Sequence, residues 1–104
     1  MSNAFTTNFD HLPQSVQKVV TLIQEKLTPK KIILFGSRAR GDARENSDYD
    51  LCVVGAASNS IRSQVRLLVD EEPLTLFKID LLFYEDLAPD YLENIKKEGL
   101  LLYG

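Results

Sequence analysis

Short apolar runs rich in β-branched and aromatic residues alternate with amphipathic segments, and this alternation limits the folds open to the chain. Such runs predict strands, and they occupy residues 31–35, 48–54, 76–84 and, more briefly, 100–103. Apolar residues at three-to-four spacing are typical of helices that bury one face, and they occur over residues 12–27, 61–69 and 89–98. Strands interleaved with helices predict an α/β sandwich in which the helices pack on a sheet.

The length of 104 residues suits one compact domain. We therefore expect a single domain over residues 1–104, with residues 1–10 as a flexible N-terminus. Hydrophobic residues make up 44% and charged residues 26% of the chain, which is typical of a globular protein and not of a disordered one. No apolar run is long enough to cross a membrane and the start lacks a signal-peptide pattern, so we expect a cytoplasmic protein.

Charge is distributed unevenly along the chain. Residues 1–47 carry a net charge of +3 and residues 48–104 a net charge of −6. The acidic total disfavours non-specific binding to nucleic acid. A basic segment followed by an acidic one suits a bound metal-phosphate group, although an ordinary solvated surface explains it as well. Cys52 is the only cysteine and His11 the only histidine, so a metal would need oxygen ligands.

Three carboxylates lie in the predicted strands. Because side chains alternate between faces, Asp48 and Asp50 point the same way, about 7 Å apart at the backbone. If Asp80 is brought beside them, each close pair repels by roughly 4 kcal/mol at about 4 Å. Divalent cations such as Mg²⁺ would remove that cost. The alternative is that Asp48 ends a turn and that Asp80 pairs with Lys78 or an arginine.

The predicted strand 31–35 ends at Gly36-Ser37 and leads into an Arg-Ala-Arg-Gly-Asp segment. A strand that ends in Gly-Ser and opens a short helix offers backbone amides and a hydroxyl to a phosphate. Arg38 and Arg40 add positive charge that could clamp a polyphosphate. The pattern is neither a Walker loop nor a dinucleotide-binding motif. A plain turn with scattered arginines is the alternative.

Together these features resemble the nucleotidyltransferase superfamily of DNA polymerase beta: Gly36-Ser37, then ten residues, then Asp48-Tyr49-Asp50, and Asp80 in the next long strand. The sequence is most similar to the minimal nucleotidyltransferase (MNT) family, whose members pair with HEPN-domain proteins. The resemblance covers essentially the whole chain and shows no departure at the matched positions.

The resemblance implies a mixed sheet of three to four strands flanked by helices, and it implies roles for the three acidic residues. Asp48 and Asp50 would be metal ligands. Asp80 would be a third carboxylate, able to bind the catalytic metal and to help deprotonate the attacking hydroxyl. The implied metal is Mg²⁺ or Mn²⁺, and the implied substrate is ATP.

The resemblance also implies how the triphosphate is held and what the enzyme does. Gly36 and Ser37 would hold the outgoing pyrophosphate, and we extend the phosphate contacts to Arg38 and Arg40. The implied role is that of an antitoxin, which transfers AMP from ATP to a hydroxyl, that of a tyrosine, on a HEPN ribonuclease toxin.

The size of the chain argues separately for a partner. Little chain is left beyond the catalytic strands to grip a base or an acceptor, so recognition must come from another polypeptide or from a second copy. Two other functions fit the same residues. One is transfer of a nucleotide to a small hydroxyl compound such as an aminoglycoside, with a separate substrate-binding subunit. The other is a non-catalytic antitoxin that acts by occlusion.

Overall fold

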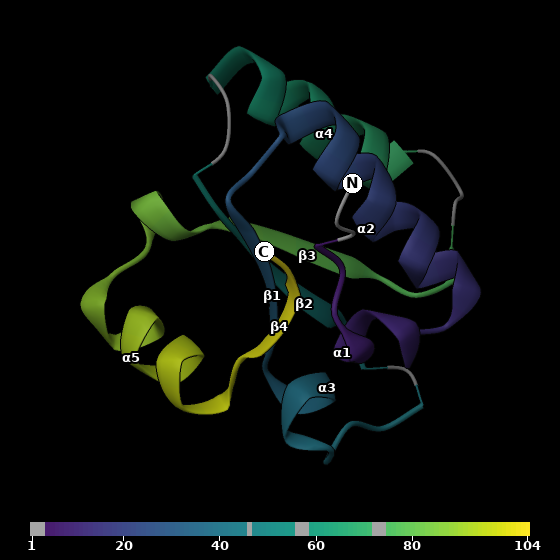
Figure 1. The fold of residues 1–104 in the computed structure, drawn as a ribbon, viewed down its shortest axis with the longest axis vertical. Coiled ribbons are helices and arrows are strands. Elements are labelled where there is room, and N and C mark those ends of the chain that lie inside the picture. The colour runs from purple at the N-terminus through teal and green to yellow at the C-terminus, as the bar shows by residue number, and fades with distance from the viewer. Residues whose placement is uncertain (1–3, 46, 56–58, 72–74) are drawn as a thin grey trace.

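Four strands form one mixed sheet in the computed structural model, which describes residues 4–45, 47–55, 59–71 and 75–104 (Figure 1). The strand order is β3-β2-β1-β4. β1 (Lys31–Phe35) pairs antiparallel with β2 (Tyr49–Val54) and with β4 (Leu100–Tyr103). β3 (Ile79–Phe83) pairs parallel with β2, which makes the sheet mixed. The fold predicted from the sequence is therefore confirmed.

Helices lie on both faces of the sheet. α2 (Gln14–Leu27) and α4 (Asn59–Glu71) cover one face, and α5 (Pro89–Glu98) lies on the other (Figure 1). The described part of the chain also contains three short helical elements, which are α1 (Thr7–Asp10), α3 (Ser37–Arg40) and the 3-10 helix η1 (Tyr84–Asp86). None of the helices in the described part of the chain combines the length and the hydropathy that a membrane crossing needs.

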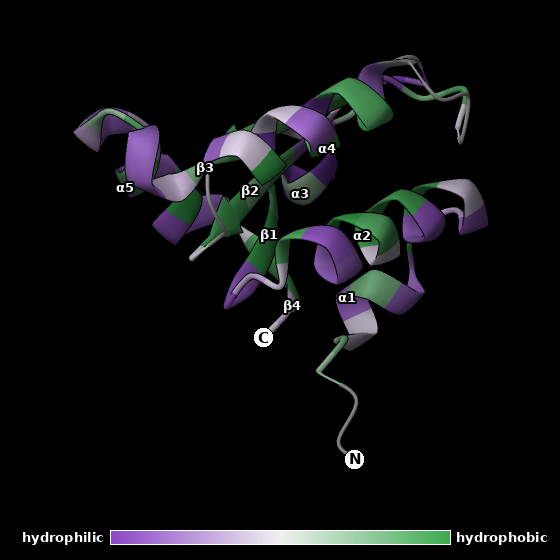
Figure 2. Cartoon of the chain, turned by 90° about the horizontal axis from the view of Figure 1, so that it is seen from above, coloured by the Kyte–Doolittle hydropathy of each residue, from purple (hydrophilic) through white to green (hydrophobic). Residues whose placement is uncertain are grey.

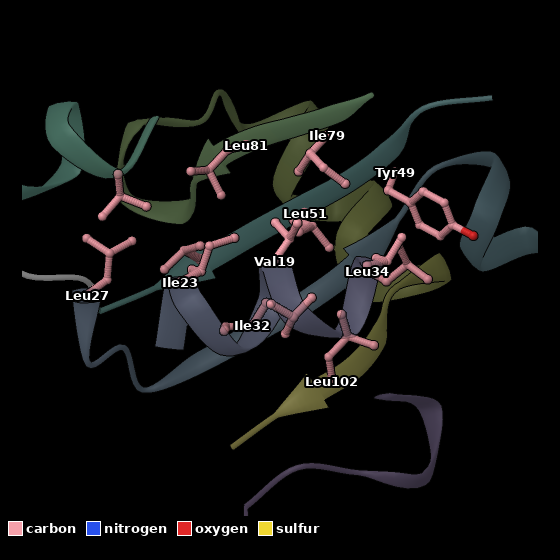
Figure 3. Close-up of a cluster of buried hydrophobic side chains, with 14 of the residues drawn as sticks. Val19, Ile23, Leu27, Ile32, Leu34, Tyr49, Leu51, Ile79, Leu81 and Leu102 are labelled. Carbon is pink, nitrogen blue, oxygen red and sulfur yellow. The ribbon is translucent and has the colours of Figure 1, made fainter. Parts of the chain in front are cut away.

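The main core lies between the sheet and α2. Val19, Ile23 and Leu27 recur at every fourth residue on α2, and all are at most 1% exposed. They face alternate residues of the strands, including Ile32, Leu34, Leu51, Ile79, Leu81 and Leu102 (Figure 3). Each fully buried aliphatic side chain contributes about 1.5–3 kcal/mol. This cluster therefore fixes which face of every strand turns inward.

The opposite face of the sheet has a smaller apolar cluster. Of the residues that the structure describes, Phe35, Cys52 and Ile95 are buried in it, with Ile33 and Leu82 among the partly buried residues around them. In Figure 2, α5 is largely hydrophilic while the strands are hydrophobic. This thinner cover leaves room for polar side chains on the same face.

Residues 5–10 have defined contacts, although the sequence assigns residues 1–10 to a flexible N-terminus; residues 1–3 lie outside the described residues. Phe5 forms a β-bridge with Tyr103, and the Thr6 amide donates to the Leu102 carbonyl at 2.9 Å. The Phe5 and Phe9 rings lie 4.3 Å apart. The N-terminal segment thereby covers the outer edge of β4.

Candidate active site

Asp50 and Asp80 lie opposite each other on neighbouring strands. In the parallel pair of β2 and β3, Asp50 is the register partner of Asp80. Side chains of register partners point to the same face, and neighbouring strands lie about 4.8 Å apart. Ile79 and Leu81, on either side of Asp80, are buried on the other face. The structure thus brings two of the predicted acidic residues together on the face that α5 covers.

Asp50 is the carboxylate most affected by this arrangement. Partial burial raises its pKa above the ordinary value, and the charges of Asp80 and Asp48 and a hydrogen bond with Asp80 raise it further. The positive charge of Arg40 acts in the opposite direction. A carboxylate near two others binds a proton more readily, because ionisation adds to the repulsion. The same crowding favours a cation at this place.

Gly36 brings backbone against the Asp50 carboxylate. It directly follows Phe35, the register partner of Asp50, and caps the N-terminus of α3 with φ +73°. This conformation is open to glycine and rarely to other residues. A Cβ atom at this position would collide with Oδ2 of Asp50. Glycine is therefore needed here for its backbone angle and for its small size.

Asp48 lies just before β2 and contacts a lysine. Its Oδ2 lies 3.8 Å from Nζ of Lys78, which precedes β3; the Lys78 side chain is exposed and that of Asp48 is partly exposed. The sequence offered Lys78 as a partner for Asp80, whereas the structure pairs it with Asp48. The parallel register explains this, because Tyr49 is the partner of Ile79 and the residues before them also meet.

The side chains present suit a hard divalent cation only in part. Asp50 and Asp80 supply adjacent carboxylate oxygens, which are the ligands that Mg²⁺ prefers. Among the described residues, no three acidic, histidine or cysteine side chains gather closely enough to form a metal cluster. Asp48 would have to exchange Lys78 for the metal to complete the predicted set. Metal binding by Asp48, Asp50 and Asp80 stays a prediction.

Arg38 braces the loop that leads to Asp48. Its guanidinium donates to the Ser47 carbonyl at 3.0 and 3.3 Å and to the Glu45 carbonyl at 3.1 Å. It also lies 4.5 Å from the ring centre of Tyr49, whose side chain belongs to the main core. Arg38 is therefore on the side of the sheet away from Asp50. The phosphate contact of Arg38 stays a prediction. The structure shows that the Arg38 guanidinium holds the loop before β2 through its carbonyl groups.

Arg40 lies closer to the carboxylates. It donates to Asp42 at 3.2 Å and to Glu98, at the end of α5, at 3.1 Å. Its charge acts on Asp50, as the pKa of that residue shows. Sequence reasoning missed Glu98, which is 58 residues further along the chain. No local pattern could have found it, because the contact depends on how α5 packs.

The fold and the paired carboxylates beside Gly36 suit an enzyme that transfers nucleotidyl groups. The model of a family described as "Polymerase beta, Nucleotidyltransferase" matches residues 17–104. The chain belongs to this family, and the resemblance found in the sequence is confirmed.

Two relatives from Methanocaldococcus jannaschii share the name "Putative protein adenylyltransferase". One is 36% identical over 78 residues, which cover 71% of this chain and 78% of that protein. The other is 28% identical over 92 residues, which cover 86% and 92%. Both likenesses agree with a nucleotidyltransferase activity for this chain.

Solved structures share the fold. One described as "Structure of putative minimal nucleotidyltransferase" has a TM-score of 0.66 at 29% identity, over 88% of this chain and 93% of that chain. Another is a complex of tri-AMPylated Shewanella oneidensis HEPN toxin with MNT antitoxin, with a TM-score of 0.59 at 20% identity, over 86% and 70%. At that identity the second likeness shows the fold alone.

Proposed function

We propose that this nucleotidyltransferase transfers AMP from ATP to a hydroxyl group, that of a tyrosine, on a HEPN-domain toxin, and that it thereby acts as an antitoxin. The observation that carries the proposal is the register pairing of Asp50 with Asp80 beside Gly36. The names of the adenylyltransferase relatives support AMP as the group transferred. The toxin–antitoxin complexes of the same fold support the kind of partner.

The chemistry is an in-line displacement at the α-phosphorus of ATP. The acceptor oxygen forms a bond to that phosphorus, the bond to the β-phosphate oxygen breaks, and pyrophosphate leaves. Asp80, the more exposed of the two paired carboxylates, takes the proton from the acceptor hydroxyl. Gly36 and Ser37 hold the leaving pyrophosphate through backbone amides and the serine hydroxyl. A divalent cation, when bound by Asp48, Asp50 and Asp80, would offset the charge that develops on the phosphate oxygens.

The test is a labelling experiment with the HEPN-domain protein encoded beside this chain. We expect label from ATP carrying ³²P at the α-position, and none from ATP labelled at the γ-position. The Asp48→Ala/Asp50→Ala variant should lose the label, whereas a matched Asp70→Ala/Asp90→Ala variant, changed at exposed positions of α4 and α5, should keep it. Equal labelling by the wild type and the first variant would contradict the proposal.

The same variants separate catalysis from occlusion. If transfer inactivates the toxin, Asp48→Ala/Asp50→Ala should bind the toxin but fail to neutralise it. Neutralisation by that variant, without label on the toxin, would support occlusion. Label on an aminoglycoside and none on the protein would support the small-molecule activity.

A further inference from the structure

The face of the sheet that carries Asp50 and Asp80 has less helical cover than the opposite face. Two helices, α2 and α4, lie on the opposite face, whereas α5 lies on this one (Figure 1). Beside α5, over β1 and β4, is a groove of about 570 Å³. The helical layer on this face therefore has room for another element.

The floor of the groove is apolar. It is formed by side chains from three strands and two helical elements: Ile33, Val54, Tyr84, Ile95 and Leu101. Of these, Ile95 is buried and the other four remain partly exposed. When a partner covers apolar area that is in contact with water, the complex is stabilised by roughly 25 cal/mol per Å². The floor thus favours an occupant with an apolar side.

The rim of the groove is basic. Lys30, Lys31 and Lys96 line it, all three are exposed, and no described residue that lines it is acidic. No described acidic side chain forms an ion pair with any of these lysines. Glu85 places one negative charge near Lys30, because its carboxylate accepts a hydrogen bond from the amide of Gly55, which lies next to the Lys30 side chain. Lys31 and Lys96 are the rim lysines away from this carboxylate. The charge therefore favours an acidic occupant.

A helix suits this place better than a strand. The outer edge of β4 is already covered, because Phe5 bridges Tyr103 and the Thr6 amide donates to Leu102. The groove lies over the face of the sheet, next to a helix, where helices pack in a layer. An amphipathic helix can place apolar residues on the floor and acidic residues against the lysines.

We propose that this groove docks an acidic amphipathic helix of the partner protein. The proposal rests on the proposed function in taking the HEPN-domain protein as that partner. Lys31 begins β1 and Gly36 follows its last residue, about 17 Å further along the chain, whereas Ile33 on the groove floor lies about 7 Å before Phe35, the register partner of Asp50. The groove therefore lies next to the Asp50 and Asp80 carboxylates without including them, and a partner docked there leaves them free for the acceptor hydroxyl.

The test measures the dissociation constant for the HEPN-domain protein by titration calorimetry. Lys31→Glu/Lys96→Glu should weaken binding more than about tenfold, because it turns attraction into repulsion. The matched control, Lys18→Glu/Lys26→Glu, makes the same charge change on α2 and should stay within about twofold. Thermal melts check that both variants fold. Equal effects of the two variants, or no binding by the wild type, would overturn the docking site.

The outcome can be separated from that of the proposed function. Asp48→Ala/Asp50→Ala should bind the partner as the wild type does and fail to label it. Loss of binding in the groove variant without labelling by the wild type would overturn the activity alone. Labelling by the wild type with unchanged binding in the groove variant would overturn the docking site alone.

A cross-linking experiment identifies what occupies the groove. A photoreactive maleimide can be attached at Lys96→Cys, since Cys52 is 0% exposed and should not compete. We expect mass spectrometry to find a partner peptide with apolar residues at three-to-four spacing and acidic residues beside them. A basic peptide, or a peptide from a second copy of this chain, would overturn the proposal.

Discussion

Asp50 on β2 lies directly across from Asp80 on β3, in the parallel part of the sheet. The antiparallel register of β1 and β2 places Phe35 beside Asp50, so that the next residue, Gly36, reaches the same carboxylate. Two strand pairings therefore converge on Asp50. We expect the stability and the activity of the protein to depend on this one residue in opposite ways.

Asp50→Asn should raise the free energy of unfolding at neutral pH while it removes nucleotidyl transfer. The pKa of Asp50 in the folded protein is raised above its ordinary value of 3.8, first by burial and then by Asp80 and Asp48. The folded state therefore holds the proton more tightly, and stability falls as pH rises through the interval between the two pKa values. The gain from the variant should be absent at lower pH and fully present above that interval.

Urea unfolding as a function of pH measures this effect. The control is Asp70→Asn, a change at an exposed helical position. A variant at position 50 that is less stable than the wild type at pH 7 would argue against carboxylate repulsion as the main effect.

Gly36→Ala should destabilise the protein by about 1–3 kcal/mol, because alanine at positive φ is strained, and it should also abolish labelling. The Cβ atom would displace the Asp50 carboxylate. Gly41→Ala is a matched control, since Gly41 has φ +84° and nothing within 4 Å of the added atom. Gly41→Ala should lower the free energy of unfolding only by the backbone strain, and it should keep most of the labelling activity. Equal losses of labelling in the two variants would mean that contact with Asp50 is unimportant.

Arg38→Lys should impair the enzyme even though it keeps the positive charge. The planar guanidinium donates to the carbonyls of both Ser47 and Glu45, and a lysine cannot reproduce that fork. We expect faster tryptic cleavage after Arg44 and a lower rate of transfer. A variant with unchanged cleavage but weaker ATP binding would instead support a direct phosphate contact.

Cys52 should be inert in the native protein. Its side chain is 0% exposed, and burial raises the pKa of the thiol to about 12. Reaction with iodoacetamide at pH 8 should therefore follow global unfolding and speed up with urea. A thiol introduced by Lys96→Cys should react at once under the same conditions. Rapid native labelling of Cys52 would show that the cover given by α5 opens locally.

Alternation along the strands predicts the α/β sandwich, the shared face of Asp48 and Asp50, and an Asp80 side chain turned away from the core. The mixed sheet and the meeting of Asp80 with Asp50 are what the family resemblance implies. The apolar positions 79, 81 and 83 leave one possible side for Asp80. The hydrogen bonds by which Arg38 holds the loop before β2 cannot be predicted from alternation. Its side chain turns to the opposite side of the sheet, and this depends on the path of a loop with no repeating pattern.

Contacts between segments that lie far apart in the sequence also cannot be predicted from it. The pair of Arg40 with Glu98 needs the position of α5, and the pair of Lys78 with Asp48 needs the register of β2 and β3. The basic groove joins residues from the start of β1 and the end of α5. Periodicity fixes which face a residue takes, whereas these contacts depend on how whole elements pack.

The most direct test of the account is the single-turnover rate of AMP transfer to the HEPN-domain protein in four forms: wild type, Asp50→Asn, Asp80→Asn and the double variant. If the two carboxylates act as one unit, each single variant should lose at least about a hundredfold in rate, and the double variant should lose little more. A rate for Asp80→Asn close to that of the wild type would contradict the account.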